Sequence, residues 1–76
     1  MPRYFFAMDG EGADNVGYDF PDLAAAKHEA LVRLGEAMRE EPEKFLADGS
    51  RLITVSGPDG ERQFSVTVTI AIHATE

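Results

Sequence analysis

The two histidines, His28 and His73, carry the side chain most suited to bind a metal or transfer a proton at neutral pH. A zinc site needs three or four ligands, and a nucleophilic site needs a base beside Ser or Cys together with an orienting acid. The chain has no cysteine. His28 falls on the outward side of a predicted helix, and His73 lies in the C-terminal segment. The sequence therefore predicts two solvated histidines, no catalytic residue, no metal site and no enzymatic activity.

A polar, glycine-rich segment from Asp9 to Asn15 is the second place to look for ligand chemistry. A calcium loop of the EF-hand type needs oxygen ligands at alternate positions and a bidentate Glu at the twelfth. Asp9 and Glu11 fit that spacing, but Ala13 stands where the third ligand is needed, and Phe20 stands at the twelfth position of the loop. The Gly-Glu-Gly triplet in this segment lacks the lysine and the following helix that a phosphate-binding loop requires. We expect a hairpin loop and no cofactor.

Charge limits the partners that the chain can bind. Acidic residues outnumber basic ones by 14 to 7, which gives a formal net charge of -7. Nucleic acids and anionic membranes are bound mainly by clustered Lys and Arg, and the cations here are scattered along the chain. We therefore expect no nucleic acid and no membrane partner. The acidic run of Glu40, Glu41 and Glu43 is either a solvated helix end or a contact for a basic protein.

The length of 76 residues predicts a single domain, residues 1–76. The 43% hydrophobic content is enough to build one core without a disulfide or a metal. The first apolar run, residues 4–8, is too short for a signal-peptide core or a membrane span. A cytoplasmic location is the default expectation.

Periodicity predicts the elements of the first half of the chain. Residues 3–8 form a strand that is apolar on both faces, and residues 16–20 return as a short strand. Residues 23–40 are strong helix formers with apolar side chains three or four positions apart, and Asp22 is the expected N-cap. Pro42 ends this helix and can open a further short helical turn.

The second half predicts a hairpin. Its strands cover residues 51–56 and 63–72, and the Gly-Pro-Asp-Gly sequence between them is strong turn chemistry. A four-residue loop pairs Ile53 with Phe64 and places the apolar residues of both strands on one face. The second strand is longer than its partner, so we place it in the centre of the sheet, with the N-terminal strand along its free half.

These elements predict an α+β fold, a small ββαββ (or βαββ) domain. Its mainly antiparallel sheet has three to four strands, and one main helix packs on one face. The predicted core contains the apolar residues on the facing sides of helix and sheet, namely Phe6, Leu23, Ala30, Leu34, Ile53, Phe64, Val66, Val68 and Ile70.

The other face of the predicted sheet is small, semi-apolar and almost free of charge. Open solvated faces usually carry Lys and Glu, so this surface is a candidate for contact with another protein; the alternative is a plain Thr-rich face in solvent. The predicted interaction face consists of Phe5, Leu52, Thr54, Ser65, Thr67, Thr69 and Ala71.

The Arg-Tyr-Phe-Phe opening at residues 3–6 and the Pro-Asp-Leu helix start at residues 21–23 resemble a family of short alphaproteobacterial proteins known only as a domain of unknown function. This resemblance covers most of the chain and implies a stand-alone small domain with no assigned activity. Residues 20–23, Phe-Pro-Asp-Leu, are also similar to HicB-type antitoxins.

The missing catalytic groups and the uncharged sheet face predict a non-enzymatic protein-interaction module that associates with itself as a homodimer. The alternative, implied by the antitoxin similarity and the net charge, is an acidic protein that binds and neutralises a basic partner.

Overall fold

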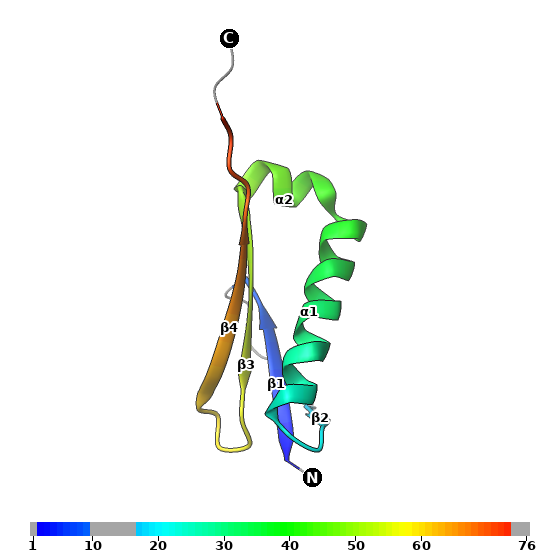
Figure 1. The fold of residues 1–76 in the computed structure, drawn as a ribbon, viewed down its shortest axis with the longest axis vertical. Coiled ribbons are helices and arrows are strands. Elements are labelled where there is room, and N and C mark those ends of the chain that lie inside the picture. The colour runs from blue at the N-terminus through cyan, green and yellow to red at the C-terminus, as the bar shows by residue number, and fades with distance from the viewer. Residues whose placement is uncertain (1, 10–16, 74–76) are drawn as a thin grey trace.

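The computed structural model describes residues 2–9 and 17–73, and Figure 1 shows how they are arranged. These residues form six elements in the order β1 (Arg3–Met8), β2 (Tyr18–Asp19), α1 (Leu23–Glu40), α2 (Pro42–Asp48), β3 (Ser50–Ser56) and β4 (Arg62–Thr69). Their strands make one antiparallel sheet in the order β2-β1-β3-β4, with α1 along one face. The predicted α+β class with one main helix is confirmed. Apart from Asp9, the loop predicted over residues 9–15 lies outside the described residues.

Helix α1 is positioned by a stripe of small and branched side chains. Asp22 caps its first turn as predicted, because its Oδ1 accepts the backbone N–H of Ala25 at 3.0 Å. Ala26, Ala30 and Leu34 lie four residues apart and are almost completely buried against the sheet. The methyl side chains of the two alanines allow the helix to lie close to β3 and β1.

Helix α2 returns the chain to the sheet. It begins at Pro42, whose fixed φ suits the first turn of a helix, so the predicted helical turn is confirmed. It ends at Gly49, which has a φ of 83° and donates its N–H to the Phe45 carbonyl at 2.8 Å. Figure 1 shows that α2 crosses from the end of α1 to the start of β3.

The hairpin of β3 and β4 forms as predicted, but its register differs by two residues. Ile53 lies opposite Val66, not opposite Phe64. One residue of this shift comes from the turn, in which Gly57 donates to the Glu61 carbonyl and Gly60 adopts a φ of 84°. The other comes from a bulge between the partners of Val55 and Ser56. Because the two steps together move the strand by two positions, every side chain keeps its predicted face.

The predicted strand order is wrong. β3, not β4, lies in the centre of the sheet, and β1 pairs with β3. The physical reason is that α2 delivers the chain to the edge of β1, where alternate residues of β3 become buried beneath the helices. β4 ends at Thr69, three residues before its predicted end. Ile70 donates to the Gly49 carbonyl at 2.9 Å, so the pairing stops where β3 begins.

The core lies between α1 and the central strands. Of the predicted set, four residues are buried: Phe6, Ala30, Leu34 and Ile53. Four more are partly buried and pack against this cluster: Leu23, Phe64, Val66 and Val68. Ile70 is half-buried beyond the end of β4. Tyr4, Ala26 and Val55 are buried core residues that the predicted set lacked.

Candidate functional site

The sheet face opposite α1 carries most of the predicted interaction residues. Ile53 is buried beneath the helix, so its neighbours Leu52 and Thr54 project from the other face. On β4, Thr67 lies opposite Leu52 and Ser65 lies opposite Thr54, with the Oγ atoms of Ser65 and Thr54 3.1 Å apart. The fold therefore brings these four predicted residues together in one patch, which we call the open face.

The remaining predicted residues lie at the ends of this patch. Thr69 continues it along β4, and Phe5 occupies the same face of β1. Ala71 lies beyond the end of β4, so its predicted place on the sheet is wrong. Ala7, which is opposite Thr54, also belongs to the open face. The predicted interaction face did not include Ala7, although the alternation along β1 places Ala7 on the same face as Phe5.

Charged side chains border the open face at the β2 edge. Arg3 and Asp19 lie opposite each other and form an ion pair with a 3.2 Å Nε–Oδ1 distance. Gly17 packs against the same region: a Cβ built on it would lie 2.6 Å from Cγ of Arg3 and 2.7 Å from Cε2 of Phe5. Gly17 also has a φ of 72°, so glycine is required here on both counts.

The inner face of β4 is only partly covered. Phe64, Val66 and Val68 point to the same side of the sheet as the core but remain partly exposed. The cause is the position of α1, which packs over β3 and β1, as Figure 1 shows. From α1, Lys27 reaches this strip: its Nζ lies 5.6 Å from the centre of the Phe64 ring.

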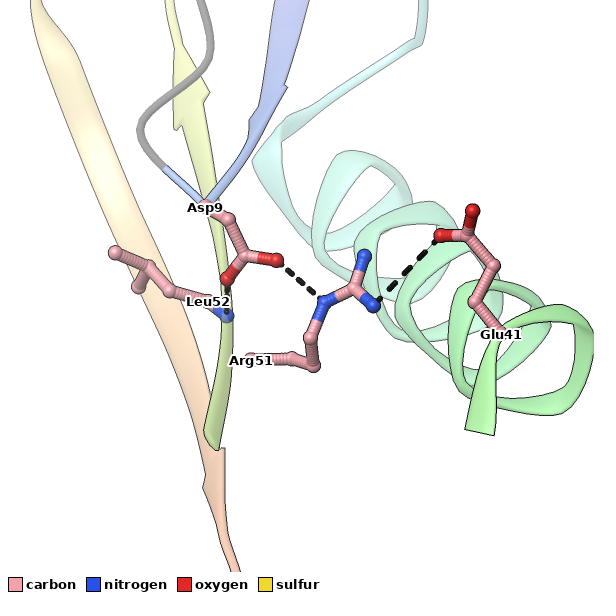
Figure 2. Close-up of polar contacts among 4 residues, drawn as sticks. All are labelled: Asp9, Glu41, Arg51 and Leu52. Atoms are coloured by element: carbon pink, nitrogen blue, oxygen red, sulfur yellow. Dashed lines mark hydrogen bonds and ion pairs between the residues drawn. The ribbon is translucent and has the colours of Figure 1, made fainter. Parts of the chain in front are cut away.

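A buried ion pair joins the sheet to the helix junction at the end where β3 begins (Figure 2). Arg51 is 3% exposed, and its Nε pairs with Oδ2 of Asp9, while Oε1 of Glu41 lies 3.9 Å from its Nη1. Asp9 also links the end of β1 to β3 through two hydrogen bonds with Leu52. Its backbone N–H donates to the Leu52 carbonyl at 2.7 Å, and its Oδ1 accepts the Leu52 N–H at 2.8 Å. This cluster holds three segments together.

The sequence predicted a loop position for Asp9 and showed Arg51 only as one of several scattered cations. The alternation of β3 could have identified this pair. Arg51 stands two residues before Ile53 and four before Val55, so it lies on the same face of the strand as these core residues. A cation on the core face needs an acidic partner, and Asp9 directly follows β1, the strand that pairs with β3. The position of the acid depended on the pairing of β1 with β3, which the sequence did not reveal.

A second cluster fixes β2 against α1. The guanidinium carbon of Arg33 lies 4.3 Å from the ring centres of both Phe6 and Tyr18, and its Nε pairs with Oε2 of Glu29 at 2.9 Å. Burial opposes the charge of Arg33, but the Glu29 carboxylate and the Tyr18 side chain outweigh it and raise the pKa of Arg33 above its ordinary value. The cluster explains how a strand of two residues is held in place.

The described residues do not bring together the side chains that metal chemistry needs. His28 is exposed on α1 and His73 is exposed beyond β4, as predicted. Across residues 2–9 and 17–73, no three His, Cys, Asp or Glu side chains are grouped as metal ligands. Among the described helices, none is long and apolar enough to cross a membrane.

Residues 2–9 and 17–73 thus form a small α+β domain whose antiparallel sheet has helix on one face, with no helix or strand of these residues on the other. The chain is a member of the family described as Domain of unknown function (DUF6894), whose sequence profile matches residues 3–69. The predicted resemblance to a domain-of-unknown-function family is confirmed, and the description of that family names no enzyme. Searches of curated proteins and of solved structures gave no match.

Proposed function

We propose that this domain is a non-enzymatic protein-interaction module that associates with itself through its strand layer. The strand layer comprises the open face and the free edge of β4. The observation that carries the proposal is the composition of this layer, in which Ser, Thr and apolar side chains replace the Lys and Glu that usually cover a solvated sheet.

Two features of the described residues support the strand layer over the helix layer. The exposed residues of α1 include the charged side chains of Glu36 and Arg39, which favour solvation. By contrast, the seven residues from Gln63 to Thr69 include no charged side chain. Because each copy carries a net charge of -7, self-association requires a contact surface without acidic groups, and the strand layer is such a surface.

Sedimentation equilibrium of the wild-type chain from about 10 to about 500 µM is the direct test. We expect a weak, reversible dimer with a dissociation constant of about micromolar order. The matched control is Val32→Lys, which adds a charge at an exposed position of α1. Its association constant should be unchanged. A wild-type monomer at every concentration, or a dimer abolished by Val32→Lys, would refute the proposal.

The alternative of an acidic antitoxin-like protein for a basic partner stays a prediction, as does the cytoplasmic location. Its contact would be the acidic run, in which Glu40, Glu41 and Glu43 are all exposed. Capture of a basic protein from the native host that is lost on replacing these three residues with Gln would favour that alternative.

A further inference from the structure

The sheet has two edges of opposite character. The β2 edge is two residues long and carries the ion pair of Arg3 and Asp19. The β4 edge is eight residues long, and no charged residue or proline interrupts its last seven residues. Proteins usually protect a long edge with charge, proline or a covering segment. The described residues supply none of these along Gln63–Thr69, which leaves this part of the edge open for another strand.

The hydrogen-bond pattern identifies the backbone groups on the free edge. Ile70 donates its N–H to the Gly49 carbonyl, toward β3. Because the direction of the N–H and C=O groups alternates along an antiparallel strand, those of Val68, Val66 and Phe64 also point toward β3. The groups that point outward are therefore those of Gln63, Ser65, Thr67 and Thr69.

The side chains beside this edge also lack full cover. Phe64, Val66 and Val68 are partly exposed on the side of α1. Leu31 is 56% exposed and lies one turn after Lys27, on the side of the helix that faces Phe64. A strand added at the β4 edge would extend the apolar strip and shield these side chains from water.

We propose that a second copy of this chain adds to β4 as an antiparallel strand, with the two-fold axis at Val66. This inference rests on the proposed self-association and specifies its geometry. Val66 then lies opposite Val66 of the partner subunit, and Phe64 opposite Val68 of the partner subunit. The two four-stranded sheets become one continuous sheet with both main helices on the same face.

Self-complementarity selects a second copy as the occupant and selects this register. The outward backbone groups belong to odd-numbered residues, so a two-fold pairing joins odd residues to odd residues and keeps apolar side chains against apolar ones. Centring on Val66 pairs all four outward-facing residues and makes about eight backbone hydrogen bonds. A shift of two residues in the pairing leaves one of the four without a partner. Arg62 lies at the end of the paired segment, outside its apolar centre.

Disulfide trapping tests the register, since the natural chain has no cysteine. In Val66→Cys, the two cysteines meet on the axis with Cα atoms about 4.5 Å apart, within the range of a disulfide. We expect most of this variant to become a covalent dimer on mild oxidation. In the control Val68→Cys, the cysteines of the two copies are about 14 Å apart along the strand and should remain free. Preferential trapping of Ser65→Cys or Thr67→Cys over Val66→Cys would overturn the register.

Two substitutions at Thr67 distinguish edge pairing from packing of the open faces. Thr67→Pro removes an outward N–H and leaves the bonds to β3 intact, so it should weaken association at least tenfold by sedimentation equilibrium. Thr67→Lys places its charge in solvent beside the paired edge and should change association less than twofold. Packing of two open faces would reverse this order, because the lysine would then be buried. That reversal would overturn the edge geometry.

Amide hydrogen exchange of the wild-type chain provides a measurement that needs no variant to fold. The Ser65 and Thr67 amides should become protected as the concentration rises, whereas face packing would leave them exchanging at the monomer rate. A wild-type dimer without this protection and without Val66→Cys trapping refutes the edge but keeps the proposed function. A monomer at all concentrations refutes both. Protection that appears only with a different host protein would refute the second copy as occupant.

Discussion

Neutralising Asp9 should destabilise the domain far more than neutralising Asp19, although both aspartates pair with an arginine. Asp9→Asn keeps a side-chain oxygen in place for the Leu52 N–H and removes only the negative charge. The side chain of its partner, Arg51, is 3% exposed, whereas the side chains of Asp19 and Arg3 are 47% and 52% exposed. Both substitutions replace Asp with Asn, so the difference in their effect on stability reports how deeply each arginine partner is buried.

The magnitude follows from that difference. Removing one member of a buried ion pair leaves an uncompensated charge and costs about 3–5 kcal/mol. The distant carboxylate of Glu41, at 3.9 Å from Arg51, favours the lower end for Asp9→Asn. An exposed pair contributes about 0.2–1 kcal/mol, which is the cost expected for Asp19→Asn. A domain of this size has a total unfolding free energy of about 4–11 kcal/mol, so Asp9→Asn removes a large share of it.

Thermal and urea unfolding, followed by circular dichroism in dilute protein at neutral pH, measure both variants. At about 6 °C per kcal/mol for this chain length, Asp9→Asn should lower Tm by about 20 °C and Asp19→Asn by a few degrees. Dilution keeps any association from adding to the apparent stability. The double variant Asp9→Asn with Arg51→Met should recover much of the loss, because no charge is then left buried.

Equal small losses for the two single variants would show that Arg51 reaches water, and the account of the buried cluster would be wrong. Failure of the double variant to recover any stability would show that the loss in Asp9→Asn does not come from a charge left buried on Arg51.

Three further predictions concern the helix, a turn glycine and nucleic acid. Leu34→Ala should cost about 2–5 kcal/mol, and Leu31→Ala on the same helix less than about 0.5 kcal/mol, since the first side chain is 1% exposed and the second 56%. Gly17→Ala should cost about 1–2 kcal/mol for its positive φ and its contact with Arg3, whereas Gly35→Ala in open helix surface should add about 0.5–1 kcal/mol; equal effects on urea midpoints would contradict the geometry. The domain should not shift DNA or RNA in a gel at micromolar protein and physiological salt, and a salt-sensitive shift would contradict the charge argument.

Local patterns in the sequence determined most of the secondary structure. Asp22 caps α1, Pro42 opens α2, and the Gly-Pro-Asp-Gly turn joins β3 to β4, because each of these depends on residues within a few positions. The sequence also determined which face of its strand each side chain occupies, because side chains alternate along a strand whatever its neighbour is. For that reason Leu52, Thr54, Ser65 and Thr67 lie on one face of the sheet as expected, even though the register was wrong by two residues and Ala71 lies beyond β4.

Tertiary structure alone decided which strand lies in the centre. The sequence favoured β4 because of its long alternating run, but the helices deliver β3 to the side of β1. Three nonlocal features depend on that choice: the pairing of Asp9 with Arg51, the partial exposure of Val66, and the free edge of β4. A chain pattern encodes which side of a strand is buried, whereas the neighbour that buries it depends on how the connecting helices return the chain in space.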